Sequence, residues 1–534
     1  MSVQNIRAPL RVTLALPSTE SPAWVWRTQD RLQEADFLAL TTVAVDKDPV
    51  PENRGSLLFN LWMRFETTVF GHKIASPGHS ERPVSPPTEL DPVPEDIETD
   101  VIVWMLPGRP PPELIGKAKH GVMTIAGAFD PMYGLNEFLD QEPATRCDIV
   151  VFGAEPSEDL VLVSSFARTD SILFSKGINE IRAKCVALLL ATLNRFRHGA
   201  DPRLDGLPQE PVTPSVSAAP GGLRIIRGLT FIFARFVRTS LFPGGEFDQW
   251  QLAYRLGGDR LDQSKLQYLA PEHTGFWADP FIAEQDGRRF IFFEELSPET
   301  KRGHLAAVEV YPDGRIGEPV NILMSDHHLS YPFVFEHQGS LFMAPECGSS
   351  GRVEVLRCDR FPDRWESHAV LLDGVTAFDP TLVEHDGRWW MFVTMQHNGN
   401  SCNDELHLFH TEDVFGEWTP HTLNPVRLDV RAARPAGALF RENGKLYRPA
   451  QDCSGRYGRA ISIQEIRRMT PDEYEEVEVQ RISAEFKPAA LATHTVNQAH
   501  GIVVYDCQIR ARKKPEAEVN TDRNIRQQTS RETD

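Results

Sequence analysis

Two patterns of apolar and polar residues divide this chain. Residues 10–200 alternate short apolar runs, which favour strands, with longer amphipathic segments typical of helices. From about residue 245 to 508 the apolar runs are short and paired, and Asp-Gly, Gln-Gly or Asn-Gly turns separate them, as in β-hairpins. The pattern therefore predicts an α/β domain followed by an all-β domain.

The N-terminal pattern predicts a Rossmann-style sheet. Helical segments such as 56–71 separate the apolar runs, which favours a largely parallel sheet. The first turn, residues 16–21, lacks the Gly-x-Gly-x-x-Gly that holds a dinucleotide pyrophosphate, so we expect no nicotinamide cofactor. The predicted strands are 10–16, 37–45, 101–106, 121–127 and 147–154.

Segments that resist regular structure mark the boundaries of the domains. Residues 73–99 are dense in proline and acid, which predicts a surface insertion within a first domain spanning 1–203. Residues 204–222 have a similar composition and are predicted to be the interdomain linker. Residues 510–534 are polar and charged, and we expect a disordered tail there.

Beyond the linker one unit repeats. Pro280, Pro332, Pro380 and Pro435 each stand near the start of a predicted strand, at spacings of 52, 48 and 55 residues. Each is followed by a hairpin turn and an aromatic-rich strand, and a weaker fifth unit begins at Thr493-His494. Four strands per unit and five units predict a five-bladed β-propeller over 245–508.

The residue before each repeated proline is polar. In a propeller the innermost strand of every blade lines the central channel, so these positions are predicted to converge on one opening. Carboxylates that meet in this way suit glycosidic chemistry. Each Asp-Pro also fits a plain turn, and one of two adjacent strand residues must face away from the channel. The converging set is Asp279, Tyr331 with His328 and Ser330, Asp379, Arg434 and His494, and the partner strands add Glu294, Glu295, Glu346, Gln396 and Asp452.

These units carry a resemblance. FWADPFIAEQDG, HHLSYPFVFEHQG, AFDPTLVEHDGRWWMF, RPAGALFRENGKLYRPAQD and THTVN look like the propeller at the N-terminal side of plant glucosamine inositolphosphorylceramide transferases and in bacterial polysaccharide-cluster proteins. That propeller is similar to the five-bladed furanosidases of glycoside hydrolase families 43 and 32. FARTDSILFSKGINEIRAKCVALLLATLNR, with the sheet before it, resembles the formyltransferase-like domain of the bacterial members.

The resemblance implies roles for particular residues. Asp279 matches the furanosidase nucleophile or base, and Asp379 matches the aspartate that orients the sugar. Glu346 is the candidate acid, although it precedes Asp379 in the chain, and Asp452 competes for that role. The implied sugar-binding residues are His328, Tyr331, Arg434, Asp452 and His494, with no metal.

The formyltransferase resemblance does not imply formyl transfer. The comparable strand end, GVMTIAGAFDPMYG, lacks the Asn and His that such enzymes use, so we expect no active formyltransferase.

Charge and cysteine content narrow the partners and the compartment. The net charge of −19 argues against a nucleic-acid partner. No secretory signal or apolar span is evident, and the odd number of cysteines favours free thiols, so we expect a cytoplasmic protein. The seven are Cys147, Cys185, Cys347, Cys358, Cys402, Cys453 and Cys507.

Residues 223–242 form a predicted cationic amphipathic helix. Arg224, Arg227, Arg235 and Arg238 share one side, and apolar residues, among them Ile226, Leu229, Phe233, Phe236 and Val237, occupy the other. Such a helix either docks between the domains or makes peripheral contact with an anionic membrane.

Three functions are compatible with these features. The first is a carbohydrate-active enzyme that forms or remodels a glycosidic bond in surface polysaccharide or glycolipid biosynthesis, using a nucleotide-sugar donor rather than a bound cofactor. The second is a furanosidase-type glycoside hydrolase, and the third is a glycan-binding scaffold without catalysis. The expected partner in each case is a carbohydrate or glycolipid.

Overall fold

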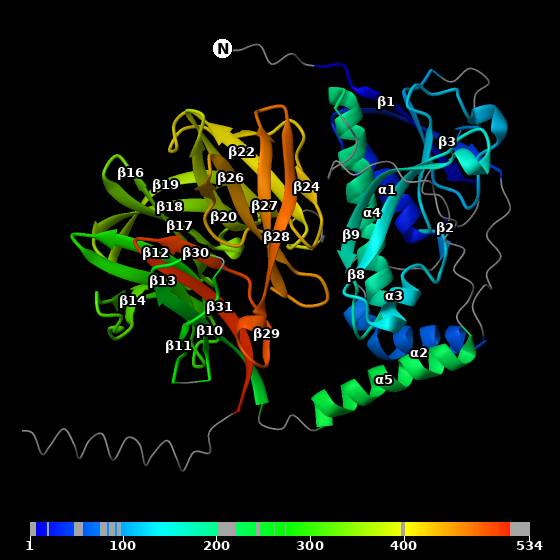
Figure 1. The fold of residues 1–534 in the computed structure, drawn as a ribbon. Coiled ribbons are helices and arrows are strands. Elements are labelled where there is room, and N and C mark those ends of the chain that lie inside the picture. Colours follow the sequence, from blue (N-terminus) through cyan, green and yellow to red (C-terminus); the bar gives the residue numbers. More distant parts are fainter. Residues whose placement is uncertain are drawn as a thin grey trace, which may run out of the picture.

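The chain folds into an α/β domain beside a β-propeller (Figure 1). The structure, a computed structural model, describes residues 7–18, 21–46, 57–74, 83–84, 91–92, 98–200, 221–241, 246–260, 262–272, 274–396 and 401–512. Most of the predicted insertion, linker and tail therefore lies outside the described residues.

The N-terminal domain is built on a seven-stranded sheet in the order β5-β3-β1-β6-β7-β8-β9. The first five strands in this order pair in parallel, whereas β8 and β9 join antiparallel. The expectation of a parallel sheet thus holds for one part, and the sheet as a whole is mixed. The strands are β1 (Leu10–Pro17), β3 (Leu38–Val45), β5 (Asp91–Pro92), β6 (Val101–Trp104), β7 (Val122–Ile125), β8 (Ala144–Val151) and β9 (Leu160–Arg168).

The predicted insertion at 73–99 is not free of strands. Strand β5 extends the sheet beside β3, and β4 (Pro83–Val84) pairs with β2 (Ser21–Pro22). Each has only two residues, as the density of proline would lead one to expect.

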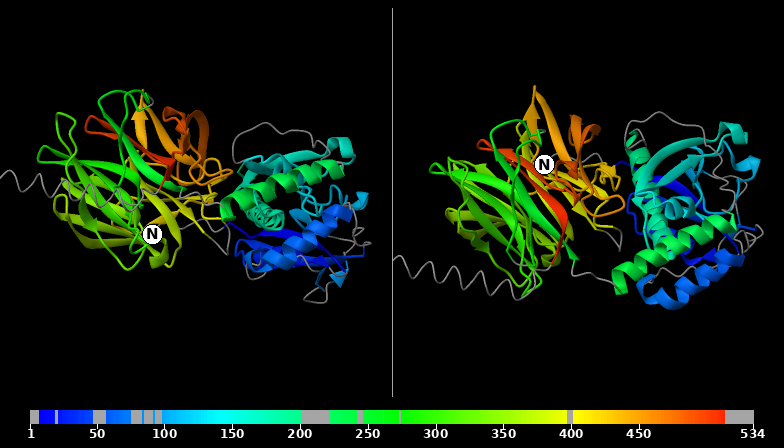
Figure 2. Two further views of the ribbon diagram at one scale, coloured as in Figure 1. Left: turned by 90° about the horizontal axis from the view of Figure 1, so that it is seen from below. Right: turned by 60° about the horizontal axis from the view of Figure 1, so that its bottom comes forward.

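Five α-helices are described, and α4 connects the sheet to the propeller. Its inner face buries Ile181, Cys185 and Leu188 in the core, and Gly199 ends it in a left-handed conformation. Helix α5 lies along α2 and α3 (Figures 1 and 2). No helix among the described residues is long and apolar enough to cross a bilayer. The helices are α1 (Ala23–Gln33), α2 (Leu57–Ile74), α3 (Leu135–Asp140), α4 (Phe174–His198) and α5 (Gly222–Leu241).

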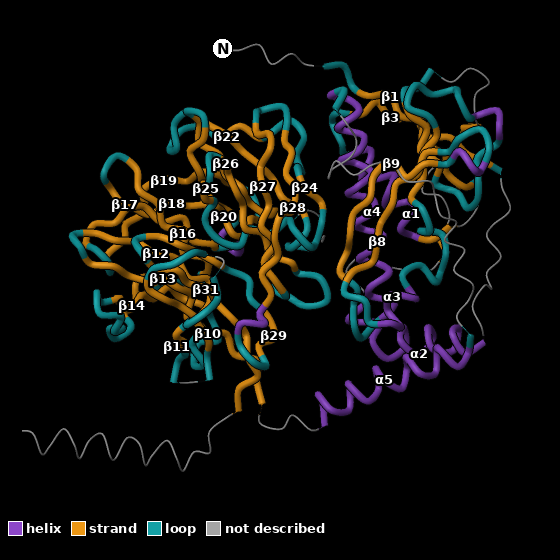
Figure 3. The backbone as a smooth tube through the Cα atoms, in the orientation of Figure 1, coloured by secondary structure: helices purple, strands orange, loops and turns teal. Residues whose placement is uncertain are grey.

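The C-terminal domain consists of five antiparallel sheets around an axis, as predicted (Figure 3). The first blade holds β12 (Phe276–Gln285), β13 (Arg288–Leu296), β14 (Gly303–Val310) and β15 (Val320–Leu323). The second holds β16 (Ser330–His337), β17 (Ser340–Glu346), β18 (Arg352–Arg360) and β19 (Arg364–Asp373). The third holds β20 (Ala377–His385), β21 (Arg388–Met395), β22 (Glu405–Thr411), β23 (Thr419–Pro420) and β24 (Arg427–Leu428). The fourth holds β25 (Phe440–Glu442), β26 (Lys445–Asp452), β27 (Ala460–Met469) and β28 (Tyr474–Ser483).

The fifth blade closes the ring with strands from both ends of the domain. It combines β10 (Glu246–Leu256) and β11 (Gln267–Leu269) with β29 (Ala490–Ala492), β30 (Val496–Ala499) and β31 (Ile502–Arg512). Strand β31 pairs with β10 along its whole length, from Ile502 to Arg512. The prediction that the tail begins at 510 is therefore wrong by three residues, because Arg510 and Arg512 pair with Asp248 and Glu246 on β10.

The two domains share a buried contact. Lys184 on α4 forms an ion pair with Asp404 of the third blade at 3.0 Å, and both side chains are almost fully buried. The backbone N–H of Val430 donates to the carbonyl of Phe166, and that of Gly455 donates to Pro143. The domains are thus joined through the third and fourth blades.

Candidate functional site

The inner strands of three blades begin with the same strained feature. Asp279, Tyr331 and Asp379 have φ values of 52°, 45° and 52°, and the strand register shifts at each of them. A β-bulge with a left-handed residue before proline is uncommon for non-glycine residues. Its recurrence shows that each side chain is turned at the same point of its blade.

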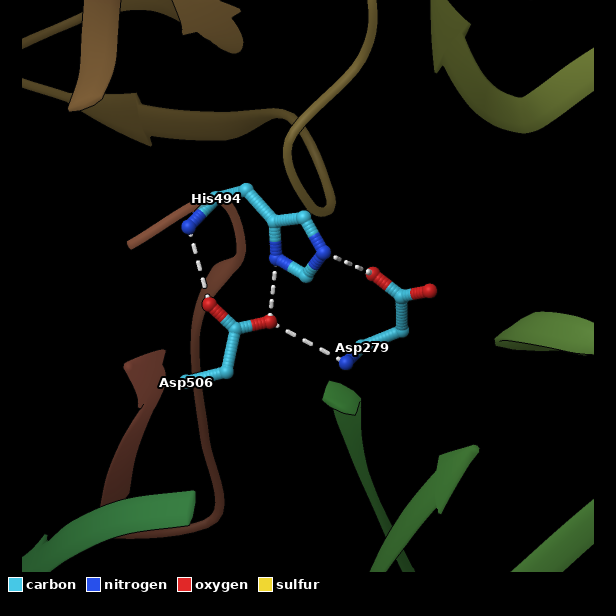
Figure 4. Close-up of side chains that lie close together, drawn as sticks. All are labelled: Asp279, His494 and Asp506. Carbon is cyan, nitrogen blue, oxygen red and sulfur yellow. Dashed lines mark hydrogen bonds and ion pairs between the residues drawn. The ribbon is translucent and has the colours of Figure 1, made fainter. Parts of the chain in front are cut away.

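Asp279 meets a histidine and a second aspartate from the fifth blade (Figure 4). His494 Nε2 lies 3.7 Å from Asp279 Oδ1, and His494 Nδ1 lies 2.5 Å from Asp506 Oδ2. Thr495 Oγ1 donates to Asp279 Oδ1 at 2.8 Å. No hydrogen bond from a described residue reaches Asp279 Oδ2, in contrast to Oδ1.

Burial shifts the pKa values of this group. Desolvation, partly offset by His494, raises the pKa of Asp279 to about 7. Burial alone would lower the pKa of His494, but the charges of Asp506 and Asp279 outweigh it and raise that pKa to about 9. His494 is therefore a cation at neutral pH, whereas Asp279 is divided between its two protonation states.

A second cluster surrounds Arg434. Its guanidinium donates to Asp379 Oδ2 at 2.6 Å and to Glu346 Oε2 at 3.0 Å, and all three residues are buried. Burial and the charge of Asp379 hold the pKa of Glu346 well above its usual value. Gln451 Nε2 also donates to Asp379, at 2.8 Å. Asp379 is therefore fixed by three donors, Nε and Nη2 of Arg434 and Nε2 of Gln451, while burial and the charge of Asp379 favour the protonated form of Glu346.

The two clusters repeat one contact between blades. The backbone N–H of Asp279 donates to Asp506 of the preceding blade, and that of Asp379 donates to Glu346 of its preceding blade. The charge of Asp379 also acts on Asp279 and His494. The structure thus brings Asp279, Asp379, Glu346, Arg434 and His494 together at the hub.

The other predicted residues lie around this centre in different ways. His328 is about half exposed, and its Nε2 lies 3.1 Å from Glu294, which holds the pKa of His328 above its usual value. Tyr331 is fully buried, and its hydroxyl bonds Thr381 and the N–H of Gly437. Asp452 accepts hydrogen bonds from Arg481 and from the N–H of Ser454. Arg481 rather than a hub residue is thus the charged partner of Asp452.

Several hub residues were not singled out from the sequence. Asp506 ends the weak fifth unit, at the same place in its blade as Glu346, and this equivalence could have identified it. Trp250 stacks on His494 with ring centroids 4.0 Å apart, and Tyr457, 36% exposed, meets His494 edge-on. Neither aromatic residue belongs to the repeated motif.

The first cluster also has the composition of a metal site. Asp279, His494 and Asp506 offer ligand atoms within 4.8 Å of one another. These atoms already form the His494–Asp506 and His494–Asp279 contacts, so a cation would have to displace His494 from its carboxylate partners. The geometry accordingly describes an acid–base chain of Asp506, His494 and Asp279.

Two solved structures resemble the propeller part loosely. A family 117 glycoside hydrolase from Zobellia galactanivorans is 13% identical, with a TM-score of 0.33, over 49% of this chain and 90% of that chain. A GH43_1 enzyme from Xanthomonas citri is 10% identical, with a TM-score of 0.33, over 44% and 88%.

Sequence comparison gives a closer match. "Glucosamine inositolphosphorylceramide transferase 1" of Oryza sativa subsp. japonica is 36% identical over 210 residues, or 39% of this chain and 28% of the relative. The protein of the same name from Arabidopsis thaliana is 35% identical over 211 residues, or 39% and 27%. The chain thus spans little more than a quarter of these relatives. Residues 267–504, the greater part of the propeller, match the family described as "Glucosamine inositolphosphorylceramide transferase 1, N-terminal".

Proposed function

We propose that this chain is a carbohydrate-active enzyme that forms or remodels a glycosidic bond in surface polysaccharide or glycolipid biosynthesis. The observation that carries the proposal is Asp279, a buried carboxyl group with a pKa of about 7 that meets His494 at the hub. It lies within the region that matches the transferase family.

The hub supplies two carboxyl groups with different tasks. Asp279 is partly ionised near pH 7 and removes the proton from an attacking sugar hydroxyl, which is the task of a general base. Glu346, whose pKa is raised by burial and by the charge of Asp379, serves as the acid toward the leaving oxygen. Asp379, fixed by Arg434 and Gln451, orients the sugar.

The donor would bind in the N-terminal domain. In open α/β sheets, ligands bind beyond the carboxyl ends of the parallel strands, which are here β1, β3, β6 and β7. We propose that this domain recruits the nucleotide-sugar, whose sugar and leaving oxygen lie at the hub with the acceptor when Asp279 and Glu346 act.

Two other functions use the same geometry. A furanosidase-type hydrolase would activate water rather than a sugar hydroxyl with Asp279. A glycan-binding scaffold would use the hub without catalysis, and the near-complete burial of Asp379 and His494 favours it over a wide-open active site.

The Asp279→Asn variant separates catalysis from binding. The change keeps size and hydrogen bonding but removes the base, so turnover should fall by roughly 10²-fold or more while sugar affinity stays within a few-fold. The assay follows product formation from lipid-linked acceptors with nucleotide-sugars, and from simple furanosides, beside calorimetric glycan binding.

Asp286→Asn is the matched control. Asp286 also has a positive φ, 53°, but it is exposed and lies in the turn after β12, far from the hub. The variant should therefore behave as wild type. Wild-type binding without turnover on any substrate would support the scaffold, and turnover on furanosides alone would support the hydrolase.

We further propose that the enzyme works in the cytoplasm, in peripheral contact with a membrane through residues 223–242. Helix α5 packs Ile225 and Gly228 toward α2 and α3. Other apolar residues stay exposed: Phe233 on α5 is 67% exposed, and Leu57 and Phe65 on α2 are 78% and 58% exposed. Arg227 on the polar side of α5 adds an exposed cation to an otherwise acidic protein. Apolar side chains beside arginines suit an anionic lipid surface.

Sedimentation with vesicles tests this contact. The protein should bind vesicles that contain phosphatidylglycerol more tightly than vesicles of phosphatidylcholine alone. Phe233→Ser should weaken binding by about 10-fold or more, because a buried phenyl ring contributes roughly 1.5–3 kcal/mol. Val479→Ser, which removes an exposed apolar residue on the propeller, is the control. Equal weakening by both variants would contradict the contact.

A further inference from the structure

A pocket of about 520 Å³ lies at the end of the propeller away from the hub. It is lined by strand β25, by residues 498–501 at the end of β30 and in the turn after it, and by Asp259 and Arg260. Strand β30 begins just after His494 and ends at Ala499, on the pocket wall. At about 3.3 Å per residue, the pocket is roughly 15 Å from His494, so it is separate from the hub.

Arg260 is a buried cation on this wall. Its side chain is only 9% exposed, and no hydrogen bond or ion pair joins its guanidinium to another described residue. Its guanidinium carbon lies 3.6 Å from the centroid of the Phe440 ring. The buried guanidinium groups of Arg434 and Arg448, in contrast, both bind carboxylates.

The surroundings of Arg260 compensate its charge only in part. Burial lowers the pKa of Arg260 to about 10, although the charges of Tyr505, Glu442 and Asp259 act in the opposite direction. An isolated buried charge is costly for a folded protein, and a bound counter-ion removes that cost.

A second arginine lines the same pocket. Arg441 donates to His385 Nδ1 at 2.7 Å and to the carbonyl of Glu384, and no ion pair with a carboxylate is found for it within the described ranges. Two guanidinium groups on one wall form the donor arrangement that suits a carboxylate or phosphate group.

The acidic side chain of Glu442 adds a different preference. A carboxylate accepts hydrogen bonds from hydroxyl groups and repels a second charge, so it favours a ligand that carries hydroxyls next to its anionic group. The volume lies in the range of small-molecule sites. We propose that this pocket binds an acidic sugar, with its carboxylate or phosphate on Arg260 and Arg441 and its hydroxyls toward Glu442.

Calorimetry on the full chain tests the pocket with four probes: glucuronate, glucose 6-phosphate, inorganic phosphate and glucose. We expect one of the two acidic sugars to bind and glucose not to bind. The acidic sugar that binds shows whether the anionic group is a carboxylate or a phosphate. Phosphate that binds as tightly as glucose 6-phosphate, or absence of binding by both acidic sugars, would overturn the proposal.

Two variants connect the binding to these residues. Arg260→Met and Arg441→Met should each weaken the acidic sugar by about 10-fold or more, the scale of a lost charge-assisted hydrogen bond. Arg260→Met should keep or raise the melting temperature, because it removes an incompletely compensated charge. Unchanged affinity in both variants would refute the site. If Arg260→Met does not fold, the affinity of Arg441→Met decides the question. Neither residue belongs to the hub, so the outcome is independent of the proposed enzyme activity.

Discussion

The Arg434→Met substitution tests whether the second hub cluster is held together by charge. The guanidinium is buried and binds Asp379 and Glu346, so its loss leaves the buried Asp379 carboxylate with Gln451 as its one remaining hydrogen-bond donor among the described residues. Removing one partner of a buried ion pair destabilises a protein by about 3–5 kcal/mol. For a domain of this size that corresponds to a melting temperature lower by roughly 6–20 °C.

The loss should depend on pH with a defined sign. Burial and Asp379 raise the pKa of Glu346, and Arg434 opposes that rise. Without Arg434 the native state therefore holds this proton to higher pH than the unfolded state does, so its stability falls as pH rises. The melting difference from wild type should therefore be larger at pH 8 than at pH 5. Scanning calorimetry is the suitable measurement, because it resolves the unfolding of two domains.

Two further variants calibrate this result. Arg360→Met breaks an exposed ion pair with Asp363 and should cost less than about 1 kcal/mol. Arg434→Met combined with Asp379→Asn should recover part of the loss, because the unpaired charge is gone. An Arg434→Met protein that melts within about 2 °C of wild type, or one whose deficit is the same at pH 5 and pH 8, would refute the electrostatic account.

Three more predictions concern neighbouring groups. The folded-state pKa of His494 is raised, so wild type has extra stability below pH 6.5 and loses it as pH rises through about 9. His494→Gln should lack this extra stability. The urea midpoints of the two proteins should therefore converge over that range. Thr495→Val removes a hydrogen bond to Asp279, so the acid limb of the pH–activity profile should move upward, and an unmoved limb would exclude Asp279 as the base. Lys184→Met leaves Asp404 buried without its partner, so the calorimetric transitions of the two domains should separate further, whereas Arg360→Met at an exposed pair should leave them unchanged.

The sequence alone determined the local parts of this fold. Hairpin turns, paired strands and the spacing of the X-Pro units depend on residues close together in the chain, so the five blades follow from the order of the residues. The residues at the starts of the inner strands, Asp279, Asp379, Arg434 and His494, followed from the same repetition.

Only the tertiary structure decided which partners those residues meet. Asp506 reaches Asp279 across 227 residues, and it does so only after β31 closes the ring against β10. Gln451 rather than Asp452 binds Asp379, because neighbouring residues of a strand point to opposite sides and the side that faces the axis is not visible in the sequence. The incompletely compensated charge of Arg260 is likewise a property of packing, since a sequence shows that an arginine is present but not whether a carboxylate lies within its reach.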